Sequence, residues 1–438
     1  MNSAVRRFPL GGADLVLIGM AEVAQAPANN AVMVITCSAP ITPADLRAAL
    51  DRLIKVCPWP TARLKRSFPW GALHWVVDAR KKPLAPAVQH RRAPPSTIQE
   101  IVEHELRTPI DPAKDAPIRF LIVDHDHAAM PAVTTIIMTW CHALMDPRGA
   151  QNLLRHLSEA RHDNSALGNV IPNFLPRQDV QPFLARARIA SKCYDLLESY
   201  AAEPPRSPGL GAASPGALRF RLESFVDAPA LPASERAKHD FWYRLAVVGC
   251  AVAELARERR WPDHPLIVPV SLDQRRKGDA EPTFGNTLAI HFARFRPSEA
   301  TNVEVLANLL RKQITDAMRE GAIDTISIGM EFLKFRRPRK ITQGIPWAAT
   351  GDFFSFACAD IGPVPPTIDR VFGARVINAY HMATIPPRPG LGVFFNRCGD
   401  INNLVVCWAE GALEERHVER IVALVQSSLA WEKFPTQA

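Results

Sequence analysis

One histidine, followed four positions later by an aspartate, is the most reactive arrangement in this sequence. His142 and Asp146 belong to the run WCHALMD at positions 140–146. The unperturbed pKa of histidine lies near ~6.5, so a neutral imidazole can remove a proton from a hydroxyl or an amine near neutral pH. The run therefore offers His142 as a general base. Asp146 is expected either to orient the loop or the ring, or to pair with an arginine.

Two other kinds of chemistry fit the sequence less well. A zinc site would draw on His127, Cys141, His142 and Asp146, but side chains of adjacent residues diverge on an extended backbone. A serine hydrolase would carry the GxSxG motif, which the sequence lacks. An HxxxD string also arises by chance in a chain with 13 histidines, so the surrounding elements matter.

The residues around His142 predict a strand, a tight loop and a helix in succession. Residues 132–139 are apolar and β-branched, which is typical of a buried strand. They lead directly into the His142 loop, and the turn PRG at 147–149 begins a helix expected over 149–160. This position at the end of an apolar strand favours a catalytic role over a chance histidine.

Further strands and helices are expected along both halves of the chain. The expected strands cover 30–37, 72–77, 118–124, 217–226, 266–271, 286–295, 353–359, 375–379, 392–396 and 404–409. The expected helices cover 43–56 (with Thr42 as N-cap), 97–107, 183–200, 234–259, 303–320 and 414–429.

This mixture of strands and helices predicts an α/β (α+β) protein built from two similar lobes with a cleft between them. We place an N-terminal lobe at 1–200, a Pro/Gly-rich linker at 201–216 and a C-terminal lobe at 217–438. The segment 203–216 is rich in proline and small residues and is expected to be flexible.

Composition limits the partners. The 438 residues carry a net charge of +8, which favours acidic partners such as a nucleotide-bearing thioester, a carrier protein or an anionic lipid surface. The alternative is that the extra arginines serve only solubility. Nucleic acid is not expected, because the basic residues are dispersed and no zinc-finger or RNA-binding motif occurs.

The cysteines and the hydropathy pattern indicate a cytoplasmic protein. None of the eight cysteines forms a CxxC pair and most have apolar neighbours, which predicts reduced, buried thiols. No apolar stretch is long enough to span a bilayer. The basic helix expected over 183–200 either lies on a membrane surface or packs on the protein.

Four blocks of sequence, taken in order, carry a resemblance to a known superfamily. They are DPAKDAPIRFL (111–121), CHALMDP (141–147) with a glycine displaced to Gly149, LIVPVSLDQRRKGDAEPTFGN (266–286) and FFSFACADIGPV (353–364). They resemble the segments around the HHxxxDG motif of the CoA-dependent acyltransferase superfamily. That group includes chloramphenicol acetyltransferase, condensation domains and wax ester synthase-like proteins.

The resemblance implies two chloramphenicol-acetyltransferase-like lobes arranged in a V around a central channel. It implies that His142 is the general base and that Asp146 is a structural clasp paired with an arginine of the third block. The donor is then an acyl-CoA or acyl carrier protein thioester that acts as co-substrate, with no tightly bound cofactor and no metal. A small-molecule acceptor attacks it directly, without a covalent acyl-enzyme.

The sequence departs from the family pattern at four places. Cys141 replaces the first histidine, and Pro147 stands where the motif has glycine. Asp273 occupies the place of the clasp arginine, so either Arg275 takes over the pairing with Asp146 or the lobe contact is altered. Asp360 replaces an asparagine of the fourth block, where a carboxylate would repel an acyl oxyanion. It is expected to bind an acceptor or to lie away from the reaction centre.

Other candidate residues carry structural alternatives. Asn286 is expected to support the channel floor or only to shape a turn, and Ser355 to donate to an oxyanion or only to pack as a strand serine. Asp360 completes this channel and substrate set. A basic run follows near position 334, where contacts with donor phosphates compete with a solvated loop. Its candidate donor contacts are Arg336, Arg337, Arg339 and Lys340.

Two functions follow. The first is an acyltransferase that moves an acyl group from a CoA or carrier-protein thioester to a hydroxyl or amine. The alternative is a non-catalytic, condensation-domain-like docking module that recruits a carrier protein or a partner enzyme. Substitution of His142 separates them, because only the enzyme depends on a base.

Overall fold

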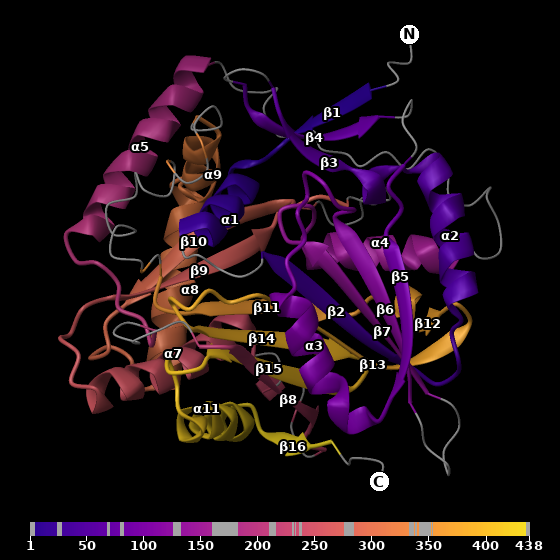
Figure 1. The fold of residues 1–438 in the computed structure, drawn as a ribbon. Helices are drawn as coiled ribbons and strands as arrows, with labels where there is room; N and C mark the ends of the chain where they lie inside the picture. Colours follow the sequence, from indigo (N-terminus) through magenta and orange to yellow (C-terminus); the bar gives the residue numbers. More distant parts are fainter. Residues whose placement is uncertain are drawn as a thin grey trace.

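The computed structural model describes residues 5–23, 29–67, 71–78, 83–125, 133–159, 183–209, 216–229, 239–275, 284–332 and 354–434, together with 232, 234–235, 337, 340 and 352. Six strands form the larger sheet, in the order β12-β13-β2-β7-β6-β5 (Figure 1). Their bounds are β2 (Asn30–Cys37), β5 (Ala87–Ala93), β6 (Ile118–His125), β7 (Thr134–Cys141), β12 (Arg370–Val371) and β13 (Ala374–Ala383). Every residue of β7 is buried, as its unbroken apolar and β-branched sequence predicts.

Three helices pack around this sheet. In α2 (Pro43–Val56) the Thr42 side chain accepts a hydrogen bond from the Asp45 N–H, which is the expected N-cap. The helix α4 (Pro147–Glu159) contacts α2 and begins two residues earlier than expected, because proline suits the first turn of a helix. The helix α3 (Ile98–Arg107) contacts β2 and β7.

The C-terminal lobe holds a five-stranded sheet in the order β11-β14-β15-β8-β16 and a separate β9-β10 hairpin. The bounds are β8 (Leu218–Asp227), β9 (Leu266–Asp273), β10 (Leu288–Phe295), β11 (Ala357–Pro363), β14 (Leu391–Cys398), β15 (Ile401–Ala409) and β16 (Trp431–Lys433). A second apolar core lies here, under α7 (Phe241–Glu258), α8 (Val303–Arg319) and α11 (Glu415–Ser428). In Figure 1 these helices lie beside and below the smaller sheet.

The two lobes share strands. Although β12 and β13 come from the C-terminal half of the chain, β13 pairs with β2 along the edge of the N-terminal sheet. The proposed boundary at 201–216 therefore does not divide the chain into two separate sheets. This exchange was not predicted, because strand partners far apart in sequence leave no local signal.

Several elements depart from the sequence expectations. The helix expected over 234–259 has its regular part in α7, which begins after the capping side chain of Asp240. The strand expected over 353–359 lies later, in β11. Helices and strands that were not predicted are β1 (Val5–Pro9), α1 (Gly12–Val23), β3 (Arg63–Arg66), β5, α9 (Ile323–Phe332), β12 and β16. In a small sheet, β1 and β3 flank β4 (Leu73–Asp78).

The linker is packed where the structure describes it, so the expectation of flexibility is wrong for residues up to 209. Ser207 and Gly209 are buried; the Ser207 hydroxyl donates to Asp352 at 2.7 Å, and the Gly209 N–H donates to the Pro389 carbonyl. Residues 210–215 lie outside the described part of the chain.

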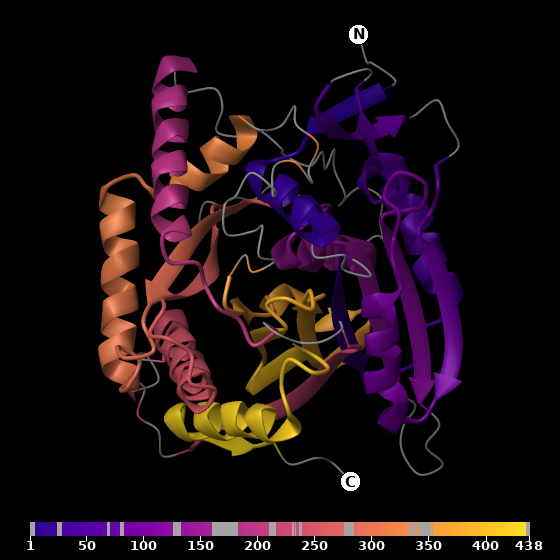
Figure 2. The same ribbon diagram turned by 60° about the vertical axis from the view of Figure 1, so that its left-hand side comes forward.

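The basic helix α5 (Phe183–Ala201) packs on the protein. It runs along α9, where Gly329 touches Cys193, and Figure 2 shows it upright beside the orange helices α8 and α9. Among the described residues, no helix combines the length and the apolar character needed to cross a bilayer. All eight cysteines are free and buried, as expected.

Candidate active site

His142 follows the last residue of β7, in a loop that main-chain hydrogen bonds fix. Its N–H donates to the Asn29 carbonyl at 2.9 Å. The indole N–H of Trp140 donates to the Met145 carbonyl at 2.8 Å and closes the loop from the strand side. The loop is therefore held before any substrate arrives, which is what a general base requires.

The imidazole of His142 is half-buried, and its Nδ1 atom has no hydrogen-bond partner among the described residues. Burial lowers the pKa of His142 below its usual value, and the negative charge of Asp146 opposes this effect. The ring is therefore neutral near pH 7 and can accept a proton.

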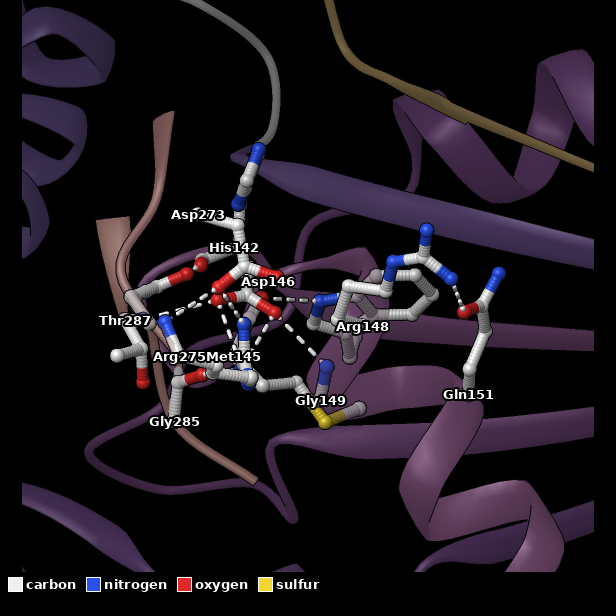
Figure 3. A network of polar contacts seen from close by, with 12 residues as sticks. His142, Met145, Asp146, Arg148, Gly149, Gln151, Asp273, Arg275, Gly285 and Thr287 are labelled. Atoms are coloured by element: carbon white, nitrogen blue, oxygen red, sulfur yellow. Dashed lines mark hydrogen bonds and ion pairs between the residues drawn. The ribbon is translucent and has the colours of Figure 1, made fainter. Parts of the chain in front are cut away.

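Asp146 lies under this loop and joins the two lobes (Figure 3). One guanidinium nitrogen of Arg275 contacts both carboxylate oxygens, at 2.9 and 3.0 Å. The backbone N–H groups of Gly149 and Thr287 donate to the same carboxylate, each at 2.8 Å. The Asp146 side chain is 1% exposed, and this set of donors compensates its buried charge.

The structure thus brings Arg275 to Asp146, the first of the two arrangements that the sequence left open. No hydrogen bond joins Asp273 to Asp146 among the described residues. Asp273 accepts hydrogen bonds from the main chain and the guanidinium of Arg275, both at 3.0 Å, and so helps to orient that arginine.

Gly149 lies where α4 closely approaches the segment around Phe284. A Cβ atom there would lie 2.7 Å from the carbonyl oxygen of Phe284, so any side chain would push the two segments apart. The displaced glycine of the motif therefore has a steric reason. It lets α4 approach the segment that carries Asn286 and Thr287.

Asn286 supports the His142 loop from below and does more than shape a turn. Its side-chain amide donates to the His142 carbonyl at 3.1 Å and to Asp14 at 2.6 Å. Asp14, on α1, also accepts from the Gly11 N–H at 2.8 Å. Burial raises the pKa of Asp14 to about 7, with a smaller contribution from the charge of Asp146.

Sequence reasoning missed Asp14. It precedes the histidine loop by more than a hundred residues in an unpredicted helix. Its only sequence signal is an acidic residue within the apolar stretch LGGADLVLIG at 10–19.

Among the described residues, neither Ser355 nor Asp360 forms a hydrogen bond with His142. Ser355 is fully buried, and its hydroxyl accepts the N–H of Ile267, so it ties the start of β11 to β9. Asp360 forms an ion pair with Arg244 at 2.9 Å and accepts the N–H of Gly362. This pairing supplies a structural reason for a carboxylate at this position.

An arginine that the sequence did not single out also crosses between the lobes. Arg148, on α4, donates to Gln151 at 3.0 Å and to the carbonyl of Pro363 at 2.9 Å (Figure 3). Arg148 thereby ties the His142 loop and α4 to β11.

The remaining candidates lie apart or outside the description. Arg337 and Lys340 are exposed, and Arg336 and Arg339 lie outside the described residues, as does His127 of the zinc alternative. The part of the chain that is described holds no group of three His, Cys, Asp or Glu side chains placed to bind a metal ion.

The sequence comparisons found no match: no family model and no curated protein matches the chain. Solved structures match over nearly its whole length. Trichothecene 15-O-acetyltransferase from Fusarium sporotrichioides superposes with a TM-score of 0.68 at 10% identity, covering 97% of this chain and 95% of that one. The first condensation domain of the calcium-dependent antibiotic synthetase gives 0.67 at 13% identity, covering 97% and 96%.

The chain therefore has the fold of these acetyltransferase and condensation-domain structures. A variant of the starter condensation domain of rhizomide synthetase, solved with C8-CoA and Leu-SNAC, gives a TM-score of 0.63 at 12% identity, covering 97% and 94%. The expected fold of two lobes that mix sheet and helix is confirmed.

Proposed function

We propose that this chain is an acyltransferase that uses His142 as its general base. It transfers an acyl group from a thioester of CoA or of a carrier protein to a hydroxyl or amine acceptor. The observation that carries the proposal is the His142 imidazole, neutral and unpartnered at Nδ1, on a loop that both lobes hold rigid.

The reaction follows from the chemistry of a neutral imidazole. His142 accepts the proton of the acceptor O–H or N–H while the oxygen or nitrogen attacks the thioester carbonyl carbon. The tetrahedral intermediate collapses, the C–S bond breaks, and the imidazolium returns the proton to the departing sulfur. The products are an ester or amide and a free thiol, and no cofactor or metal takes part in the balance.

Asp146 and Arg275 act through position in this proposal. Their ion pair fixes the loop that carries His142 against the segment that carries Asn286. The charge of Asp146 also makes the imidazole more basic than burial alone would leave it.

The donor is proposed to be a soluble co-substrate. The exposed side chains of Arg337 and Lys340 belong to the basic run that we propose for contacts with CoA phosphates or with an acidic carrier protein. C8-CoA in a neighbour of the same fold supports a thioester donor as a class.

A donor panel tests the proposal. The purified protein is incubated with acyl-CoAs from acetyl to octanoyl and with hydroxyl and amine acceptors, and released thiol is measured. We expect kcat/KM for His142→Ala to fall by about 10²- to 10⁴-fold with little change in melting temperature. His104→Ala, at an exposed position on α3, is the matched control and should retain full activity. Wild-type turnover by His142→Ala would contradict the role of His142 as the base, whereas no thiol release by the wild-type protein with any donor would favour the docking module.

A further inference from the structure

A second histidine lies buried where the two lobes meet, and its ring has no polar partner. His381, on β13, is 3% exposed, yet neither Nδ1 nor Nε2 is hydrogen-bonded to any described residue. Buried polar atoms without a partner are uncommon in native proteins, because desolvation costs free energy that no bond returns. Such an atom is expected to have a hydrogen-bond partner, which the described residues do not supply.

The ring of His381 is held in place from two sides. It stacks on Trp140, with ring centroids 5.7 Å apart and an interplanar angle of 28°, and Phe394 meets it edge-on at 6.1 Å. Across the sheet, Trp140 is in register with Ala31, which is in register with Ala383. These two small side chains leave the indole room to reach the histidine.

The backbone of His381 lies where the six-stranded and the five-stranded sheets meet. The side chain of Asn396, on β14, accepts the His381 N–H at 2.9 Å and donates to the His381 carbonyl at 3.2 Å. The Asn396 side chain thus takes the place of backbone hydrogen bonds between strands at the point where β13 and β14 separate. The ring position is fixed from both lobes.

His381 is also close to the proposed base. Its stacking partner Trp140 closes the His142 loop through the indole N–H. Burial lowers the pKa of His381 well below the usual value, and the positive charge that His142 gains on protonation adds to this effect. The ring is therefore neutral, with one N–H donor and one acceptor nitrogen.

We propose that His381 is an acceptor-binding residue, whose neutral imidazole hydrogen-bonds an uncharged hydroxyl of the acyl acceptor bound beside His142. A hydroxyl both donates and accepts, so it satisfies either ring nitrogen, whereas an anion gains little from a neutral ring. The inference rests on the proposed acyl transfer and specifies the acceptor side of that site.

His381→Phe tests this inference. Phenylalanine keeps an aromatic ring against Trp140 and Phe394 and removes both nitrogens, although its ring is slightly larger. With octanoyl-CoA as the fixed donor and a series of alcohols and diols as acceptors, we expect the acceptor KM to rise at least tenfold and the donor KM to stay within twofold. Because the nitrogens are unpaired in the free protein, the melting temperature should stay equal or rise. His381→Gln, which keeps a neutral donor and acceptor, should recover part of the acceptor affinity.

Two results would overturn the inference: an unchanged acceptor KM in folded His381→Phe, or a melting temperature that falls by several degrees in His381→Phe and recovers in His381→Gln, which would mean that the nitrogens are already bonded. His142→Ala separates this failure from that of the proposed function. If His142→Ala keeps the wild-type rate, acyl transfer by His142 fails. If His142→Ala is inactive while His381→Phe binds acceptors normally, only the role of His381 fails.

Discussion

Arg275 places one guanidinium nitrogen against both carboxylate oxygens of Asp146, at 2.9 and 3.0 Å. The aspartate comes from the loop after β7 and the arginine from the segment after β9, so this one nitrogen joins the two lobes directly beneath His142. The same nitrogen also donates to the Gly285 carbonyl at 3.1 Å. A single side chain therefore controls both the stability of this joint and the position of the proposed base.

Arg275→Met should lower the free energy of unfolding by about 3 kcal/mol, because it leaves a buried carboxylate without its cation. We expect the lower end of the range for broken buried pairs, since Gly149 and Thr287 still donate to Asp146. Urea denaturation gives the value. Arg319→Met, which breaks an exposed pair with Asp316, is the control and should cause no measurable change. Equal effects of the two substitutions would contradict the structural role of the Asp146 pair.

Asp146→Asn should move the acid limb of the kcat/KM profile to lower pH. The charge of Asp146 raises the pKa of His142, so its removal lowers that pKa further and keeps the base unprotonated in more acid solution. Asp273→Asn is the matched control, because it also removes a carboxylate from Arg275, but one that is exposed and is not among the groups that shift the pKa of His142. An acid limb that stays in place in Asp146→Asn would show that the titrating group is not His142.

Asp14→Asn should change how stability depends on pH. The unfolded carboxyl loses its proton above about its ordinary pKa of 3.8, whereas the folded one holds it until about 7. Ionisation therefore favours the unfolded state in this window, and the wild type should lose up to about 4 kcal/mol relative to Asp14→Asn between pH 4 and 7. Unfolding free energies measured at intervals from pH 4 to 8 give the difference. Parallel curves for the two proteins would show that Asp14 ionises normally.

Gly149→Ala should destabilise the protein by about 1–3 kcal/mol, because the new Cβ meets the Phe284 carbonyl at 2.7 Å and pushes α4 from the opposite lobe. Acyl transfer should fall with it, since the Asp146 bonds cross the same gap. Gly321→Ala is a useful comparison, because its φ of 66° is strained for alanine but no atom lies within 4 Å. It should lower the melting temperature without lowering kcat/KM. If both variants keep full activity, the close approach at Gly149 does not matter for the site.

Local signals explain most of what the sequence predicted. The bounds of β2 and α2 were predicted to the residue, because an unbroken β-branched run and a capped amphipathic repeat are complete within their own segments. The loop between β7 and α4 was predicted for the same reason. The fold was predicted from four short blocks in order, and the solved neighbours confirm it. The catalytic role of His142 stays a prediction.

What the sequence did not reveal depends on distance along the chain. The bond from Asn286 to Asp14 joins a helix near the N-terminus to a loop of the C-terminal half. The position of His381 depends on Asn396 and on two alanines in neighbouring strands, and none of these pairings leaves a periodic pattern. The glycine at 149 was noticed as displaced, but its reason lies in a carbonyl 135 residues later.

The exchange of β13 into the N-terminal sheet also governs how the protein is made. During synthesis β2 emerges early, but its partner at residues 374–383 follows only after nearly all of the chain. At typical elongation rates this edge stays open for tens of seconds, while β7 already pairs with the other side of β2. An apolar strand with a free edge invites pairing with other chains. The nascent N-terminal lobe therefore keeps this strand edge unpaired until residues 374–383 have left the ribosome.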